Sequence, residues 1–190
     1  MNFKDNSNFE NKLWADYKKG FGKPFSSEFW LGLDEIHHIT ENGRWSVMYE
    51  VVWDKNWNGN ESLPTPDLRA GTIGRLEMND FKVNSEADNY RVSIGKMRSK
   101  ENWGGSEIQV NKFERYIHLM EFSTTDHDNK YDNKLGGGNC ASDAGFGGGG
   151  GWWFKSCSYT CLNCRGSYRQ VYDGVDRLPA SSAIWLQRTD

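Results

Sequence analysis

The sequence predicts one α+β domain with a mainly antiparallel sheet. Near the N-terminus apolar side chains recur at helical spacing, and a segment soon after it alternates between apolar and mixed residues as a strand does. The last third is dominated by glycine, acidic residues and cysteine. Aromatic residues make up 14% of the chain, whereas disordered chains are poor in them. We therefore expect a packed core followed by a region built from loops.

Length and charge limit the number of domains and the class of protein that the sequence allows. The 190 residues suit a single domain over residues 1–190. A net charge of −3 does not indicate a nucleic-acid-binding protein. No run approaches the roughly 18 apolar residues of a membrane span. The opening MNFKDNSNFENK lacks the basic and apolar regions of a signal peptide. The composition alone leaves two readings: a cytosolic chain, or one whose true N-terminus is missing.

The first expected element is an amphipathic helix. Ser7-Asn8-Phe9-Glu10 has the pattern of a capping box, in which Ser and Glu side chains bond the first free amides. Phe9, Leu13 and Tyr17 then recur every four residues and form one apolar face. Gly20 is expected to end the helix.

A second helix is expected at 33–40, closed by Asn42-Gly43. The segment 44–53 predicts a strand with one apolar face: Trp45, Val47, Tyr49, Val51 and Trp53. The stretch 56–66 is rich in Asn, Gly, Pro and Ser and predicts a loop. Further strands are expected at 71–83, 89–97 and 117–122. Beyond residue 122 we expect regular structure to fade.

The sequence contains no enzyme motif that we recognise, such as a P-loop, G-x-S-x-G or H-E-x-x-H. The glycine run 145–151 precedes Trp152-Trp153-Phe154 and not the Lys-Ser/Thr of a phosphate-binding loop. Neighbouring residues of a strand point to opposite faces. Either both tryptophans lie in the core, or one of them walls a pocket.

Cys140, Cys157, Cys161 and Cys164 predict two disulfides or one metal site. Structural zinc sites usually have two C-x-x-C knuckles, and only residues 161–164 fit, so disulfides are favoured. Disulfides indicate an oxidising compartment. The Asn60-Glu61-Ser62 sequon, a candidate glycosylation site at Asn60, agrees.

FSTTDHDNKYDNKLGGGNC (122–140) brings together Asp126, Asp128 and Asp132. It is not an EF-hand, because Lys130 and Gly137 stand where that loop needs an oxygen ligand and a glutamate. The acids either form a different calcium loop, with backbone carbonyls completing the site, or lie in solvent.

Several motifs together resemble the fibrinogen C-terminal-like family. LWADYKKGFG and SEFWLGLDEIHHIT look like its W-x-x-Y-x-x-GFG and EFWLG-x-D-x-IH signatures, and FSTTDHDN, NCA and GGWWF resemble three more. The resemblance implies an extracellular, non-enzymatic recognition module of the ficolin or tachylectin kind. Its members bind acetylated sugars or other surface ligands in innate defence or adhesion, and others bind proteins.

The resemblance also implies a Cys140–Cys157 disulfide and one calcium ion. A second disulfide, Cys161–Cys164, is expected only because the two cysteines are close together in the sequence. Calcium would be held by Asp128 and Asp132, with Asp126 behind them. Lys130 or Lys134 stands where the family has a second carboxylate, and a lysine opposes the ion, so we expect weak binding.

The implied ligand pocket lies beside that loop. Phe146, Trp153 and Tyr168 would wall it, and the amides of Cys157 and Ser158 would form its floor. The family often has His at the place of Ser158 and an aromatic residue at that of Gly148, so an acetyl preference is in question. A protein ligand is then the alternative, and a cysteine-rich metal or thiol-active protein is a further one.

Both ends are short against the family. Its opening strands would precede Met1 and a final strand would follow Asp190. We therefore expect a secreted domain, incomplete at both termini, that forms homo-oligomers through regions outside this chain. Acetylated glycans or extracellular proteins are the expected partners.

Overall fold

The structure is a computed structural model. It describes residues 7–24, 28–53, 71–102, 114–129, 138–142, 149–155, 157, 161–164 and 179–190. Within these ranges the chain has short helices and antiparallel strands, as expected for an α+β fold.

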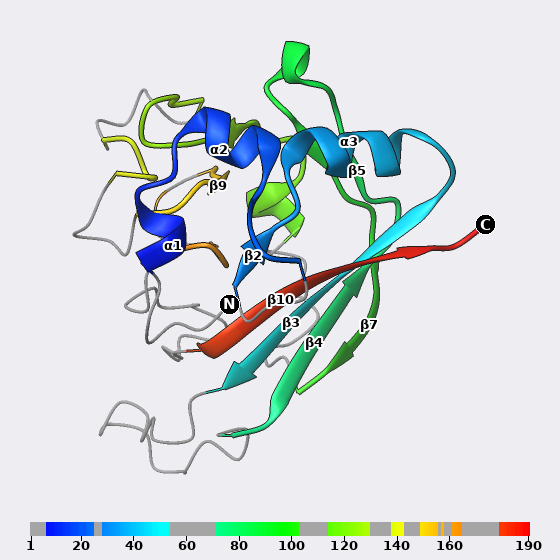
Figure 1. Cartoon of the computed structure of the whole chain (residues 1–190). Coiled ribbons are helices and arrows are strands. Elements are labelled where there is room, and N and C mark those ends of the chain that lie inside the picture. The colour runs from blue at the N-terminus through cyan, green and yellow to red at the C-terminus, as the bar shows by residue number, and fades with distance from the viewer. Residues whose placement is uncertain are drawn as a thin grey trace.

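A four-stranded antiparallel sheet forms the frame (Figure 1). Its order is β10 (Pro179–Arg188), β3 (Trp45–Trp53), β4 (Ile73–Met78) and β7 (Met97–Glu101). The register places Ile184 opposite Tyr49, and Tyr49 opposite Leu76. Because directly opposed residues lie on the same face, these three side chains point to one side of the sheet.

That side of the sheet is the core side. The predicted apolar face of residues 44–53 lies on it: Val47, Tyr49, Val51 and Trp53 are buried and Trp45 is half-buried. The helix α3 (Leu33–Glu41), together with α2 (Trp14–Lys19), lies above the sheet in Figure 1. α3 buries Leu33 and Ile36 and ends before Asn42-Gly43, as the sequence predicted.

Three two-stranded ladders complete the described structure. β1 (Phe21–Gly22) pairs with β2 (Phe29–Trp30), β5 (Lys82–Val83) with β6 (Val92–Ser93), and β8 (Phe122–Ser123) with β9 (Trp152–Trp153). A 3₁₀ turn, η1 (Glu86–Asp88), precedes β6. The predicted strands 71–83 and 89–97 are therefore each divided, into β4 and β5 and into β6 and the start of β7.

The predicted first helix is broken. α1 (Ser7–Glu10) and α2 are separated, and Leu13 lies between them with 47% of its surface exposed. Its amide donates to the Asp16 carboxylate at 3.0 Å, so Leu13 is the N-cap of a new helix. Phe9 and Tyr17 are buried as the pattern predicted, and Gly20 does end α2.

The predicted strand 117–122 is wrong except at its end. Residues 114–117 form a helical turn, and only Phe122 enters β8. The Met120 amide donates to Ile117 O at 3.1 Å and Leu119 has φ +62°, which no strand allows. The expectation that regular structure fades after residue 122 is also wrong, because β10 is a ten-residue strand of the main sheet.

Candidate functional site

The acidic loop begins as a cap on α2. Asp126 Oδ1 accepts the backbone N–H of Trp14 at 2.9 Å and the Thr124 hydroxyl at 2.7 Å. A carboxylate at a helix N-terminus satisfies a free amide and interacts favourably with the helix dipole. Burial opposes the charge of Asp126, but these hydrogen bonds outweigh it and lower its pKa. Asp126 thus has a structural function in addition to any role near an ion.

The Trp14 ring joins the same loop to η1. It stacks on His127 with ring centres 4.1 Å apart, and its Nε1 donates to Glu86 Oε1 at 2.9 Å. Glu86 also pairs with Lys18 of α2. The hydrogen bond from Lys18, then that from Trp14, lowers the pKa of the Glu86 carboxyl. Side chains from three segments far apart in the chain therefore hold the start of the loop.

Asn139 closes the loop from its other end. Its amide nitrogen donates to Thr124 O at 2.8 Å and to Thr125 O at 3.2 Å, while its Oδ1 accepts the amide of Ala141 at 2.9 Å. One side chain therefore bonds both stems, 124–129 and 138–142. Asn129 adds a bond from its side chain to Phe122 O at 2.8 Å.

The structure joins Cys140 to Cys157, the pair that the resemblance implied. This bridge connects the second stem to the segment that follows β9. The amide of Gly149 also donates to Ala141 O at 2.8 Å just before β9. The loop stem is thus tied to both sides of the tryptophan strand.

Both tryptophans of β9 lie in the core. Trp152 and Trp153 are exposed by 0% and 2%, and Trp153 Nε1 donates to Tyr90 O at 2.8 Å. Trp153 packs edge-on against Phe122, with ring centres 5.0 Å apart. The Gly151 amide donates to the Tyr17 hydroxyl at 2.8 Å. Trp153, which we predicted as a pocket wall, is thus buried in the frame beneath the loop, and it also contributes to the lining of the cleft described below.

The second bridge, Cys161–Cys164, is also formed, and both cysteines are fully buried. Between them, Leu162 O accepts the Ser182 hydroxyl of β10 at 3.2 Å. Asn163 Nδ2 donates to Gly151 O at 3.0 Å. All four cysteines are therefore paired in disulfides in this structure.

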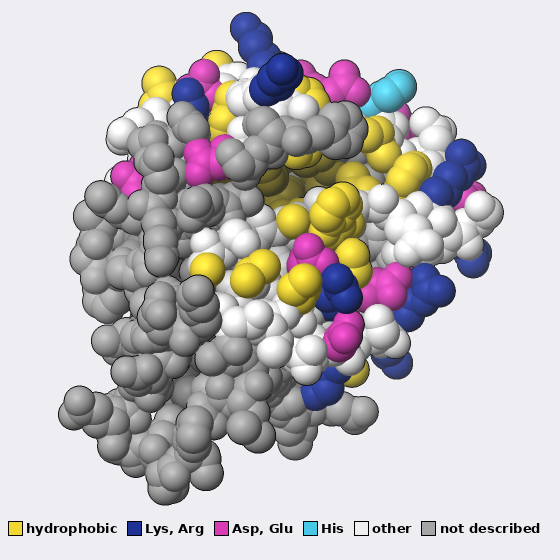
Figure 2. Space-filling view, turned by 60° about the horizontal axis from the view of Figure 1, so that its bottom comes forward, with side chains coloured by type: hydrophobic (Ala, Val, Ile, Leu, Met, Phe, Trp, Pro, Cys, Tyr) yellow, Lys and Arg dark blue, Asp and Glu magenta, His cyan; other side chains and the backbone are white. Residues whose placement is uncertain are grey.

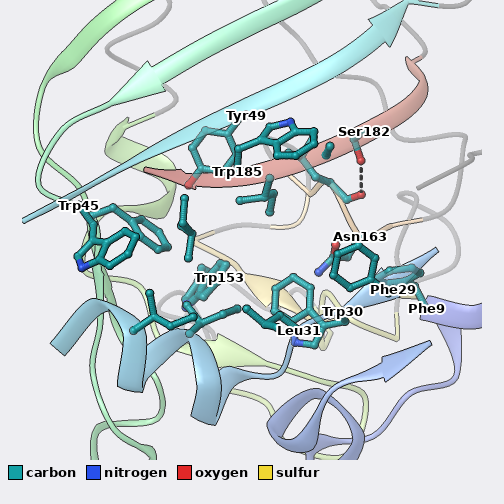
Figure 3. A pocket seen from close by; sticks show the side chains of 17 residues that line it. Phe9, Phe29, Trp30, Leu31, Trp45, Tyr49, Trp153, Asn163, Ser182 and Trp185 are labelled. Carbon is teal, nitrogen blue, oxygen red and sulfur yellow. Dashed lines mark hydrogen bonds between the residues drawn. The ribbon is translucent and has the colours of Figure 1, made fainter. Parts of the chain in front are cut away.

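A large apolar cleft lies between β10 and the helix layer (Figure 3). Its volume is about 620 Å³. Tyr49 and Trp185 come from the sheet, and Phe29, Trp30 and Leu31 come from β2 and the residue after it. Trp153, Leu162 and Asn163 contribute to the lining from the side of the disulfides. Sequence reasoning missed this cleft, because its walls come from segments whose proximity depends on the undetected strand β10.

The predicted site residues are divided between described and undescribed segments. Asp126 and Asp128 lie on the first stem, and Cys157 lies beside the second. Outside the described residues lie Asp132, Phe146, Ser158, Tyr168 and the sequon residue Asn60. In the part of the chain that is described, no three His, Cys, Asp or Glu residues are grouped to hold a metal. No helix of the described segments is long and apolar enough to cross a bilayer.

Comparison with known proteins identifies relatives along nearly the whole chain. Human fibroleukin is 32% identical over 172 residues, which are 90% of this chain and 33% of fibroleukin. Human ficolin-3 is 28% identical over 130 residues, 68% of this chain and 34% of ficolin-3. The solved fibrinogen-like globe domain of human ANGPTL6 superposes with a TM-score of 0.68 at 24% identity, covering 98% of this chain and 75% of its own.

The chain thus spans about a third of the two curated relatives. These homologues are extracellular or secreted, and domains of this kind are non-enzymatic binding modules. The family described as "Fibrinogen beta and gamma chains, C-terminal globular domain" matches residues 2–186. The protein is therefore a member of the fibrinogen C-terminal domain family, with a fibrinogen-like globe fold.

Proposed function

We propose that this domain acts outside the cell as a lectin-like receptor for acetylated sugars or similar surface ligands, with calcium support. The observation that carries the proposal is the anchoring of the acidic loop. The Asn139 side chain forms hydrogen bonds to both stems of the loop. The Cys140–Cys157 disulfide holds the second stem next to the backbone of Cys157. A loop fixed in this way can present an ion and backbone amides in one geometry, which lowers the entropic cost of binding.

Calcium would lie beyond the stem that Asp126 caps. Asp128 is exposed at the end of the described stem, four residues before Asp132 in the sequence. Oxygen ligands from both, with glycine-region carbonyls, suit calcium. Asp126 Oδ1 already accepts two hydrogen bonds, so it would orient the stem and not bind the ion directly. Because Lys130 and Lys134 flank Asp132, affinity for the ion is expected to be weak.

The ligand would lie next to this ion. Amides at Cys157 and Ser158 would donate to an acetyl carbonyl, as oriented backbone donors do. Phe146 and Tyr168 would pack against the methyl group or the sugar face. Trp153 would support them from within the core, given its burial and its bond to Tyr90.

The test is titration calorimetry with N-acetylglucosamine and with glucosamine, each in calcium and in EDTA. We expect binding of the acetylated sugar only, weakened at least tenfold by EDTA. Asp128→Asn should lower calcium affinity by about tenfold, in the range of one lost charged ligand. Glu41→Gln is the matched control, because Glu41 is an exposed carboxylate at the end of α3. Equal binding of both sugars, or no change in EDTA, would reject the acetyl or the calcium part respectively.

A further inference from the structure

The two disulfides differ in their exposure to solvent. Cys161 and Cys164 are both 0% exposed, whereas Cys157 is half-buried, and its Sγ lies 3.7 Å from Gly138 O at the surface. Its partner Cys140 is 2% exposed. An external thiolate must reach a sulfur atom to open a disulfide, so access decides which bridge reacts first. The loop bridge offers such a sulfur at Cys157, whereas both sulfurs of the other bridge are enclosed.

The surroundings of the buried bridge explain its protection. Between its cysteines, Leu162 O accepts the Ser182 hydroxyl of β10. The next residue, Asn163, donates from its side chain to Gly151 O beside β9. Leu162 and Asn163 also line the apolar cleft, and Figure 2 shows hydrophobic side chains gathered around and inside this hollow. A reductant would have to displace packed residues of the frame before it reached either sulfur.

The more exposed bridge holds the second stem of the acidic loop. Other contacts of this stem include the hydrogen bond from Asn139 to Thr124 O and the one from the Gly149 amide to Ala141 O. Single hydrogen bonds of this kind add little net stability each, and bonds near the surface open locally. The disulfide is the covalent link that keeps Cys140 in place while they open. Breaking it leaves the stem to these weaker contacts.

We propose that the Cys140–Cys157 bridge is a redox switch, which an external dithiol opens while the Cys161–Cys164 bridge stays closed. Opening the bridge frees the second stem of the acidic loop and leaves the main sheet intact. Exposed disulfides are the labile and regulatory ones, whereas buried structural disulfides resist reduction. The effect of the switch on a bound sugar rests on the proposed function, but the order of reduction and the release of the stem do not depend on it.

The chemical step is a thiol–disulfide exchange with a dithiol. One thiolate of the reductant attacks Cys157 Sγ and forms a mixed disulfide, while the bond to Cys140 breaks. Cys140 leaves as a thiolate and takes up a proton. The second thiolate of the reductant then attacks the reductant sulfur of the mixed disulfide, which closes the reductant's own disulfide and releases Cys157 as a thiol. Two electrons and two protons thus pass from the dithiol to the bridge, and an oxidised dithiol reverses the exchange.

The first test follows the order of reduction in the full chain. Samples equilibrated with increasing dithiothreitol are alkylated with iodoacetamide and mapped by mass spectrometry. We expect alkylation of Cys140 and Cys157 at a dithiothreitol concentration at least about tenfold below that needed for Cys161 and Cys164. In the half-reduced protein, hydrogen exchange should show lost protection at the Gly149 amide and retained protection along β3 and β10. Reduction of all four cysteines together, or an unchanged Gly149 amide, would overturn the proposal.

The second test measures N-acetylglucosamine binding by calorimetry in the oxidised and the half-reduced, alkylated protein. We expect opening of the loop bridge to weaken binding at least about tenfold. The Cys140→Ser/Cys157→Ser variant should bind as weakly and ignore the reductant. The matched control Cys161→Ser/Cys164→Ser keeps the loop bridge, so its response to the reductant should equal that of the parent.

Two outcomes of the binding test are distinct. Full affinity after the loop bridge is opened would overturn the switch. Failure of the oxidised parent to bind the sugar would reject the proposed ligand instead, and the order of reduction and the Gly149 amide would then decide the switch alone.

Discussion

The acidic-loop side and the β10 side of the molecule meet at β9, but they are held in different ways. On the loop side directional polar contacts dominate, from Asn139 to both stems and from Asp126 to Trp14. On the β10 side an apolar cleft dominates, with a hydrogen bond from Ser182 to Leu162 O at its base. Each side has one disulfide.

This difference suggests that the two sides differ in how selectively they bind. Directional bonds fix one geometry and fail when a single partner is lost. Apolar contact is non-directional and scales with area, so it tolerates different occupants. We therefore expect the loop side to be the more selective of the two sides. The following predictions test how far the two sides are separate.

The largest effect is expected where the sides join, at Gly150. A Cβ at this position would lie 2.0 Å from Asn163 O, a backbone atom of the short disulfide segment. Gly150→Ala must displace either β9 or that segment, and we expect a loss of about 4 kcal/mol or failure to fold. Urea unfolding measures it. Gly138→Ala is the control, because a Cβ there meets nothing within 4 Å. A mild effect at Gly150 would mean that the two sides can move apart at this junction.

The next largest losses of stability are expected from removing the disulfides, and the loss should be larger for Cys140–Cys157 than for Cys161–Cys164. Cys140 and Cys157 are 17 positions apart and Cys161 and Cys164 are 3 apart. In the chain-entropy treatment, replacing the first pair by alanine costs about 3 kcal/mol and replacing the second about 2 kcal/mol. Thermal or urea unfolding of the two double variants measures this order. A larger loss for the Cys161–Cys164 pair would show that its packing beside the cleft outweighs loop closure.

How much the sequence could predict also differs between the two sides. Local patterns gave α3 and β3, since α3 ends before Asn42-Gly43 and β3 alternates with period two. The family motifs implied the Cys140–Cys157 bridge and the fold itself. Those motifs concentrate on the loop side, so that side was anticipated in outline.

The β10 side was not anticipated, for a physical reason. In PASSAIWLQR (179–188) small residues dilute the alternation, so Ile184 and Leu186 form only a short apolar face. Strand formation there depends on pairing with β3, more than 120 positions earlier in the chain. Likewise, the break at Leu13 depends on the long-range cap from Asp126. Contacts of this separation leave no local pattern.

A pH-dependent contribution below about 1 kcal/mol is expected from the Asp126 cap, because Asp126 is exposed and solvent screens its charge. Its pKa is lower in the folded chain, so the ionised form is favoured by folding. The stabilisation is therefore present above the unfolded pKa of about 3.9 and is lost as pH falls through the lower folded value. Asp126→Ala should destabilise at neutral pH and approach the parent in acid.

Urea unfolding from pH 7 downward tests this, with Glu41→Gln as the exposed carboxylate control. Hydrogen exchange shows where the acid effect lies: we expect the Trp14 amide to lose protection before the β3–β10 amides. Simultaneous loss on both sides would contradict their separation.

The smallest effect on stability is expected from Trp185→Lys. Trp185 is 51% exposed on β10, opposite Met48 on the face away from the core, yet it contributes to the cleft lining. Exposed substitutions usually change the free energy of unfolding by less than about 0.5 kcal/mol. We expect binding of the dye ANS to the free protein to fall by about half, as exposed apolar surface is lost. Leu119→Lys, an equally exposed apolar position elsewhere, should change ANS binding much less. A stability loss above about 2 kcal/mol would instead place Trp185 in the core, and the cleft would then be part of the fold's own packing.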